Sequence, residues 1–357
     1  MRRELKTVFK PEVRALRAYS LKPRHASIKI NQNENPWELS SRIKAETLKR
    51  FDQFRWSRYP AFVSTDLQER LARFADWKAD GVLAGNGSNE LIQAVLMVTV
   101  SAGKRVLISE PTFSLYRQLT TILGGTIESV PMTTEFQYDT RSLIEAVKAH
   151  DPEVVIICSP NNPTGTRISD NDLREILNAA PGLVVIDEAY HEFFQNTVVP
   201  LLTEYDNLVV LRTFSKAMAL ASLRVGYLLA GPELVGEIRK ALLPYNLNLF
   251  SQTAAKVALE LYETELLPFI RKILAERQRL YEALNQLTGV TAIPSQANFM
   301  IVRCAIDPQI VFEHLLQRDI LIRDVSSYPM LKQYFRISVG TTEENDKLIQ
   351  GLKEIVS

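Results

Sequence analysis

Short apolar runs alternate with stretches of helical periodicity between about residues 80 and 231, and this alternation constrains the fold more than any other feature. Continuous apolar runs of four or five residues are typical of strands that are buried on both faces of a sheet. The helix-like stretches between them would cover those two faces. We therefore predict an α/β fold with a largely parallel sheet. The runs are VLIS (106–109), VVIIC (154–158), LVVI (183–186), LVVL (208–211) and VGYLLAG (225–231).

The pattern changes beyond residue 250. Residues 252–287 are rich in Ala, Leu, Glu, Lys and Arg, which predicts one or two long helices. Two strand-like pieces, NFMIVRC (298–304) and YFRISVG (334–340), then flank a helical stretch at 311–319. We expect a second, smaller α+β unit, joined to the sheet near residues 244–248.

One helix start in the first unit is ambiguous. Ser142 and Glu145 have the spacing of a capping box, but Asp139 or Thr140 could equally begin the helix.

Composition excludes several classes of protein. The chain has 42 Lys and Arg against 41 Asp and Glu, a net charge of +1, whereas a nucleic-acid binder needs a basic excess. Cys158 and Cys304 lie inside apolar runs, so we expect buried thiols and no disulfide. The N-terminal residues lack the apolar core of a secretory signal, and no apolar run is long enough to span a membrane. We expect a water-soluble, cytoplasmic protein.

The common motifs of nucleotide, metal and hydrolase sites are missing. GNGSNE (85–90) lacks the third glycine of the dinucleotide fingerprint, and neither a P-loop nor a GxSxG elbow occurs. The four histidines are scattered, so we predict no metal site.

Distinctive polar elements instead follow four of the apolar runs. They are EPTF (110–113), SPNNPTG (159–165), DEAY (187–190) and RTFSK (212–216). Because the carboxyl ends of parallel strands meet at one edge of a sheet, these elements should converge on one crevice.

These elements resemble those of the fold-type I (class I/II) aminotransferases, which use pyridoxal 5'-phosphate (PLP). The resemblance covers nearly the whole chain and is closest to the histidinol-phosphate aminotransferases. It implies a mostly parallel mixed sheet sandwiched by helices, with a smaller α+β domain. It also implies a division into an N-terminal segment joining the small domain (1–45), a large PLP-binding domain (46–248) and a small C-terminal domain (249–357). Further matching motifs are GNGSNE, LRVGY (223–227), NENPW (33–37), RYP (58–60), PSQANF (294–299), ILIRD (320–324) and FRISVGT (335–341).

Four residues of these motifs would act on the ring of the cofactor. A lysine just past a buried strand, such as Lys216, is by itself a surface residue or an amine held for imine chemistry. The resemblance implies that Lys216 forms the Schiff base with PLP and then shuttles the substrate proton. Asp187 would pair with the protonated pyridine nitrogen. Tyr190 and Asn162 would donate hydrogen bonds to the phenolic oxygen.

The cofactor phosphate would lie between two groups of residues. Ser88 and Asn89 open an apolar helical stretch, so their backbone N–H groups would form an anion site at the helix N-terminus. The resemblance adds Thr213, Ser215 and Arg224 on the other side.

Two aromatic residues complete the cofactor site by resemblance. Phe113 would stack on the pyridine ring. Tyr59 matches a residue that reaches the PLP phosphate of the neighbouring subunit, which implies a homodimer with shared active sites.

Substrate residues are assigned by resemblance as well. Arg336 would grip the α-carboxylate of the substrate as a bidentate pair. Arg323 would bind the substrate phosphate or the distal carboxylate of glutamate. Tyr19 and Asn35 belong to an N-terminal segment that folds over the site in relatives.

The chain departs from the family pattern at three places. Asn89 stands where relatives have Asp, and Trp37 stands where they have Tyr. In ALASLR (219–224), where relatives have GLAGLR, Ala219 and Ser222 stand in place of glycines and add bulk to the loop, while Ala221 matches the family pattern.

The implied reaction is a ping-pong transamination of histidine biosynthesis. L-histidinol phosphate and 2-oxoglutarate would give imidazole-acetol phosphate and L-glutamate. An aromatic amino-acid aminotransferase, a threonine-phosphate decarboxylase-like lyase and a non-catalytic PLP-binding regulator are the alternatives. Small molecules are the expected partners, with neither nucleic acid nor membrane.

Overall fold

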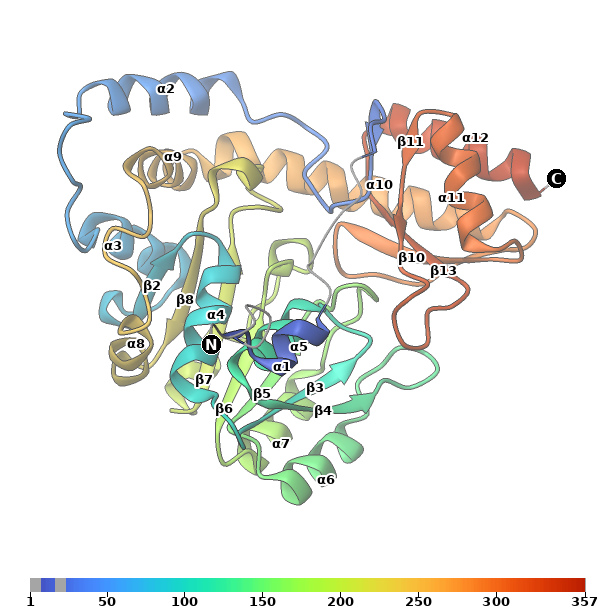
Figure 1. Ribbon diagram of the computed structural model, residues 1–357. Helices are drawn as coiled ribbons and strands as arrows, with labels where there is room; N and C mark the ends of the chain where they lie inside the picture. Colours follow the sequence, from blue (N-terminus) through green and yellow to red (C-terminus); the bar gives the residue numbers. More distant parts are fainter. Residues whose placement is uncertain (1–7, 17–23, 357) are drawn as a thin grey trace, which may run out of the picture.

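The computed structural model describes residues 8–16 and 24–356. Figure 1 shows a large unit built around one sheet and a smaller unit that contains the C-terminal helices. The large sheet has seven strands in the order β2-β8-β7-β6-β5-β3-β4, and β8 alone runs antiparallel to its neighbours. The strands are β2 (Val82–Gly85), β3 (Arg105–Glu110), β4 (Thr126–Pro131), β5 (Val154–Cys158), β6 (Leu183–Asp187), β7 (Leu208–Thr213) and β8 (Gly226–Ala230).

The five predicted strands are all present, and two strands were not predicted. Both additional strands, β2 and β4, lie at the edges of the sheet. Strand β4 contains Glu128 and Ser129 and is largely exposed, so it lacks the continuous apolar run that marks the central strands. Strand β2 is short and ends in glycine.

Helices cover both faces of this sheet. Alternate residues along β5 and β6 join two separate apolar cores, as expected when successive side chains point to opposite faces. One core includes α2 (Ser41–Asp52), α3 (Thr65–Ala75), α6 (Thr140–His150), α7 (Asp170–Ala179) and α9 (Leu249–Glu260). The other includes α4 (Ser88–Thr99), α5 (Leu115–Leu123) and α8 (Pro232–Arg239). A short helix, α1 (Pro11–Ala15), lies beside α5 (Figure 1).

The ambiguous helix start is resolved in favour of Asp139. Its carboxylate accepts a hydrogen bond from the Ser142 backbone N–H at 3.0 Å, which makes Asp139 the N-cap of α6. The predicted long helical stretch forms two helices, α9 and α10 (Leu267–Asn285), which are separated by a π-helical turn, Tyr262–Leu266.

The smaller unit packs helices on an antiparallel sheet. Its strands are ordered β12-β13-β10-β9, and α10, α11 (Pro308–Gln317) and α12 (Thr342–Val356) share its apolar core. The N-terminal strand β1 (Ile28–Lys29) pairs in parallel with β11 (Ile320–Leu321), so both ends of the chain build this unit. The domain limits at 45 and 248 stay a prediction. The sheet strands are β9 (Val290–Ala292), β10 (Phe299–Cys304), β12 (Arg323–Asp324) and β13 (Tyr334–Ser338).

Both cysteines are buried and free, which confirms that part of the prediction. Within the described ranges, no helix combines the length and the apolar character needed to cross a bilayer.

Candidate active site

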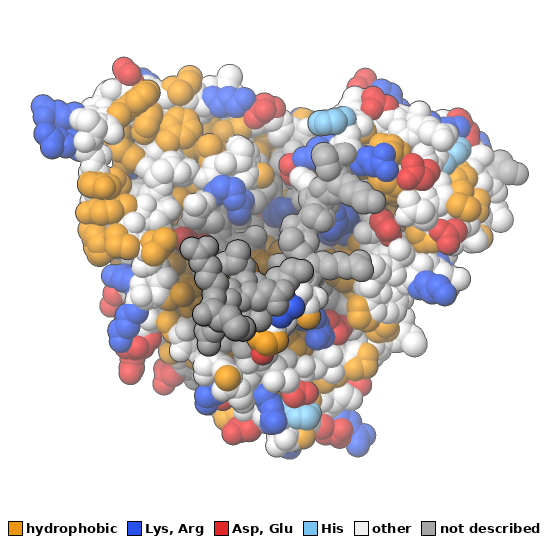
Figure 2. Space-filling model, in the orientation of Figure 1, with side chains coloured by type: hydrophobic (Ala, Val, Ile, Leu, Met, Phe, Trp, Pro, Cys, Tyr) orange, Lys and Arg blue, Asp and Glu red, His pale blue; other side chains and the backbone are white. Residues whose placement is uncertain are grey.

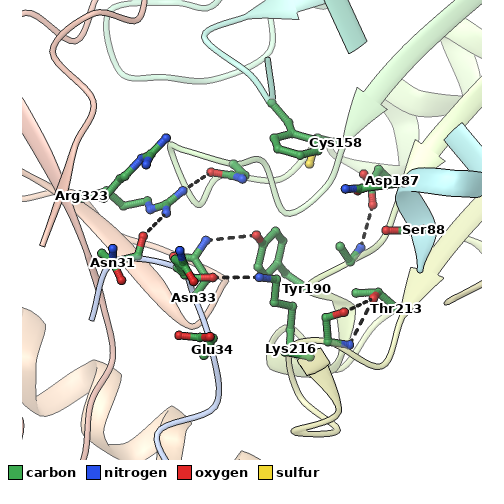
Figure 3. Close-up of a pocket in the computed structure, with 18 of the residues that line it drawn as sticks. Asn31, Asn33, Glu34, Ser88, Cys158, Asp187, Tyr190, Thr213, Lys216 and Arg323 are labelled. Atoms are coloured by element: carbon green, nitrogen blue, oxygen red, sulfur yellow. Dashed lines mark hydrogen bonds between the residues drawn. The ribbon is translucent and has the colours of Figure 1, made fainter. Parts of the chain in front are cut away.

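A cavity of about 420 Å³ lies at the carboxyl ends of β5, β6 and β7, where the polar elements were expected to converge. The N-terminal segment around Asn31 and Asn33 forms another side, and Arg323 reaches the cavity from the smaller unit (Figure 3). Arg336, also from the smaller unit, lines the cavity as well. Most of the predicted site residues line this cavity: Ser88, Asn89, Phe113, Asn162, Asp187, Tyr190, Thr213, Ser215, Lys216, Arg224, Arg323 and Arg336.

Of the predicted residues that the structure describes, Asn35 and Tyr59 are not in that lining. Asn35 donates from its side chain to the Ala217 carbonyl at 3.1 Å, directly beside Lys216. Tyr59 is 81% exposed and stacks on Tyr245 with ring centroids 4.5 Å apart. Tyr19 lies outside the described residues.

Asp187 is a carboxylate held at the buried end of a strand. Its two oxygens accept hydrogen bonds from the Tyr116 hydroxyl at 2.7 Å and from the Ala189 backbone N–H at 3.1 Å. Burial raises the pKa of the Asp187 carboxyl above its ordinary value, and these two hydrogen bonds oppose that rise. A buried carboxylate facing a cavity is suited to pair with a cationic group of a ligand.

Lys216 brings an amine to the cavity from the segment that follows β7. Its Nζ donates to the Gln32 carbonyl at 2.9 Å. Burial, reinforced by the positive charge of Arg336 and then of Arg224, lowers the pKa of this amine from 10.5 to about 8, although Glu34 acts in the opposite direction. The neutral, nucleophilic form is therefore accessible near neutral pH.

One end of the cavity is suited to an anion. Helix α4 begins at Ser88, so its first N–H groups carry the positive end of the helix dipole. The Arg224 Nη1 donates to the Ser215 hydroxyl at 2.9 Å, and the Thr213 hydroxyl donates to the same oxygen at 3.0 Å. Gly87 precedes the helix with φ 78°, and a Cβ there would lie 2.3 Å from Arg224 Nη2. The close approach of the guanidinium to the helix start therefore requires glycine.

The opposite side of the cavity holds a second cation. Arg336 is 7% exposed, and its guanidinium donates to the Asn162 side-chain oxygen and, at 2.8 Å, to the Asn31 carbonyl. It also lies 5.2 Å from the centroid of the Phe299 ring. These contacts hold a planar donor toward the cavity, where a carboxylate could bind it.

Sequence reasoning missed two residues that hold the site together. Tyr116 is fully buried, and its ring lies edge-on to Phe113 with centroids 5.6 Å apart. Asn33 donates from its side chain to the Tyr190 hydroxyl at 3.0 Å. The signals available were the three-residue spacing between Phe113 and Tyr116 and the place of Asn33 in the NENPW motif.

Comparisons with known proteins agree with this geometry. The model of the family "Aminotransferase class I and II" matches residues 26–352. A histidinol-phosphate aminotransferase of Chlorobaculum parvum is 36% identical over 355 residues, covering 99% of each chain. The crystal structure of histidinol-phosphate aminotransferase from Sinorhizobium meliloti, in complex with pyridoxal-5'-phosphate, is 25% identical, with a TM-score of 0.88 and coverage of 98% of this chain and 97% of that one. L-threonine-O-3-phosphate decarboxylase from Porphyromonas gingivalis, at 23% identity, shares the fold with a TM-score of 0.79, covering 92% of this chain and 99% of that one. The predicted fold class is thereby confirmed, and the chain belongs to the class I and II aminotransferase family.

Proposed function

We propose that this chain is a PLP-dependent aminotransferase that converts L-histidinol phosphate and 2-oxoglutarate to imidazole-acetol phosphate and L-glutamate. The observation that carries the proposal is one cavity that joins the amine of Lys216, the carboxylate of Asp187 and an anion cradle at the start of α4. Relatives named for this reaction match 99% of the chain, which supports the choice of substrate.

The donor set of the cavity fits PLP. The cofactor has a phosphate, a ring nitrogen that is cationic when protonated, a phenolic oxygen and an aldehyde, and when bound it supplies an electron sink for the substrate α-carbon. The cradle of Ser88, Asn89, Thr213, Ser215 and Arg224 suits the phosphate, and Asp187 suits the ring nitrogen. Tyr190 and Asn162 suit the phenolic oxygen, and Phe113 suits the ring face.

Lys216 and Asp187 would then have different roles in the reaction. Lys216 Nζ, with its lowered pKa, would hold the cofactor covalently and would then be free to accept and return the proton of the substrate α-carbon. Asp187 would keep the ring nitrogen protonated, because a buried carboxylate stabilises a cation beside it.

The substrate is held by the two arginines of the smaller unit. Arg336 grips the carboxylate of glutamate with its planar guanidinium. Arg323 binds the phosphate of histidinol phosphate or the distal carboxylate of glutamate. Asn35 supports the N-terminal wall of the cavity through its bond to Ala217, and Tyr19, outside the described residues, is proposed as a further substrate-binding residue.

We propose a homodimer with shared active sites. Figure 2 shows hydrophobic side chains gathered at the edge where the segment between α2 and α3 runs. Trp56, Tyr59, Phe62 and Leu243 are each at least 67% exposed there, and such a contiguous exposed set is typical of an interaction surface. Tyr59 would reach the phosphate end of the partner's cavity. We also propose a cytoplasmic location, which the two free thiols support.

A half-reaction panel tests the function. Enzyme loaded with PLP is mixed with L-histidinol phosphate, phenylalanine, tyrosine or threonine phosphate, and conversion of the cofactor to its amine form is followed by absorbance. Conversion fastest with histidinol phosphate is expected. A preference for phenylalanine or tyrosine would favour an aromatic aminotransferase, and carbon dioxide release from threonine phosphate would favour the lyase.

Two variants test the residue roles. Lys216→Ala should abolish the adduct that borohydride traps between protein and cofactor, and a surviving adduct would refute the role of Lys216. Arg336→Ala should raise the KM for glutamate by about two orders of magnitude, as expected for the loss of a buried charge pair. Unchanged turnover with glutamate would refute the carboxylate role.

A further inference from the structure

Asn33 connects three parts of the molecule at the cavity wall. It is 1% exposed and has a left-handed backbone with φ 56°, a conformation that Asn tolerates better than most residues. Its backbone carbonyl accepts from the side chain of Asn298 at 3.1 Å, and its side-chain nitrogen donates to Tyr190 at 3.0 Å. Figure 3 shows the side chains of Asn33, Tyr190 and Lys216 side by side.

Ser338 determines which way the Asn33 amide points. The Asn33 backbone N–H donates to the Ser338 hydroxyl at 2.8 Å, and that hydroxyl donates in turn to the Asn33 side-chain oxygen at 3.0 Å. Ser338 is 2% exposed and lies on β13, two residues beyond Arg336. In this arrangement the amide presents its NH₂ group to Tyr190.

The single proton of the Tyr190 hydroxyl therefore has a defined direction. A phenol has one proton to donate, and a hydroxyl that accepts from an NH₂ group must aim its own proton elsewhere. In the described part of the chain, the Tyr190 hydroxyl donates to no protein acceptor, and the residue lines the cavity.

We infer that Asn33 is a positioning residue that aims the Tyr190 proton into the cavity, at the phenolic oxygen of the bound cofactor. This inference rests on the proposed function. In this role Asn33 acts through Tyr190. Through Ser338 and β13, the same chain of hydrogen bonds links the cofactor's proton donor to the strand that carries Arg336.

The neighbouring charges do not replace this role. Burial raises the pKa of Tyr190 well above its ordinary value, which keeps the phenol protonated, while Arg336 and the Asn33 hydrogen bond oppose the rise and Cys158 and Asp187 add to it. Lys216 Nζ lies 6.0 Å from the centroid of the Tyr190 ring. The neighbouring charges influence whether the Tyr190 hydroxyl is protonated, whereas the hydrogen bond from Asn33 determines the direction of its proton.

The test is the pH at which the absorption band of the covalent protein–PLP adduct changes, measured in a double-mutant cycle. Tyr190→Phe should raise this midpoint by about one pH unit, because a phenolic oxygen without its donor is more basic. Asn33→Asp replaces the NH₂ group by an oxygen of nearly equal size, which accepts the Tyr190 proton and turns it from the cofactor. It should raise the midpoint by a similar amount in the native background and by less than half as much in the Tyr190→Phe background.

Two further variants separate hydrogen-bond direction from added charge. Asn35→Asp introduces the same negative charge two residues further along, at an amide that donates to Ala217 and not to Tyr190. The shift of the absorption midpoint that it causes should be equal in the native and Tyr190→Phe backgrounds. Ser338→Ala is uncharged and releases the Asn33 amide, so it should raise the midpoint in the native background and leave it unchanged in the Tyr190→Phe background. This second arm also decides the question if Asn33→Asp does not fold.

The outcomes distinguish this inference from the proposed function. The inference alone would be overturned if Asn33→Asp and Ser338→Ala shifted the midpoint equally in both backgrounds. It would also be overturned if these two variants left the midpoint unchanged while Tyr190→Phe shifted it. A native protein that forms no reducible adduct with PLP would overturn the proposed function and this inference together.

Discussion

Replacing Lys216 by methionine should stabilise the cofactor-free protein, and the gain should depend on pH in a defined way. The amine is half-buried in the cavity wall, where burial and the nearby arginines lower its pKa from 10.5 to about 8. In the unfolded chain the ordinary value returns. Between these two pKa values the unfolded state binds a proton that the native state does not, so the stability of the native protein rises with pH across this window.

The magnitude follows from the size of the shift. Two and a half pKa units correspond to about 3.4 kcal/mol, at about 1.36 kcal/mol for each unit. Lys216 is partly exposed to solvent, which screens part of this energy, so we expect about 2–3 kcal/mol of destabilisation below pH 8 in the native protein. The destabilisation fades between pH 8 and 10.5. Loss of the hydrogen bond to Gln32 costs the variant about 1 kcal/mol, which to a first approximation is the same at every pH.

Urea unfolding of the cofactor-free proteins at pH 7 and pH 10 measures this effect. The stability advantage of Lys216→Met over the native chain should be about 2 kcal/mol larger at pH 7 than at pH 10. Lys240→Met, at a lysine whose side chain is 67% exposed, controls for removing a lysine. A stability advantage that is equal at the two pH values, or larger at pH 10, would refute the reasoning that the lowered pKa of Lys216 destabilises the native protein.

Three further predictions concern the surroundings of the site. Tyr116→Phe removes a donor to the buried Asp187 and should lower the unfolding free energy by about 1.5–3 kcal/mol at pH 8, and by less at pH 5, in urea titrations. Glu188→Ala leaves the buried Arg212 without its carboxylate partner and should cost about 3–5 kcal/mol, whereas an apolar replacement of both residues should recover most of that loss in the same assay. Ala219→Gly should raise stability by about 0.5–1 kcal/mol, seen as a higher melting temperature, because φ is 55° at this alanine; no gain would refute the strain.

The central strands and the position of the cavity could be predicted from the sequence because both depend on local pattern. A run such as VVIIC marks a strand buried on both faces, and Asp187 follows such a run directly, so its place at the sheet edge needs no knowledge of distant residues. The same holds for Lys216, which follows β7 by three residues.

The supporting residues could not be predicted, because their partners are remote in sequence. Tyr116 bonds to a carboxylate 71 residues away, and Asn33 bonds to a hydroxyl 157 residues away. The NENPW motif and the spacing from Phe113 mark the positions of Asn33 and Tyr116, but neither signal identifies the distant partner. Edge strand β4 was missed for a different reason, since its exposed positions carry polar residues that interrupt the apolar run.

The pairing of β1 with β11 has a consequence for synthesis of the chain. Ser27, just before β1, bonds to Asp319, which is 292 residues later in the sequence. At about 5–20 residues per second, a ribosome needs about 15–60 s to make that intervening chain. The sheet of the large unit can form during this time, but β1 has no strand to pair with until β11 is made. The cavity is therefore completed only after almost the whole polypeptide has been translated, and a nascent chain stalled before β11 would carry Lys216 in a cavity that lacks Arg323 and Arg336.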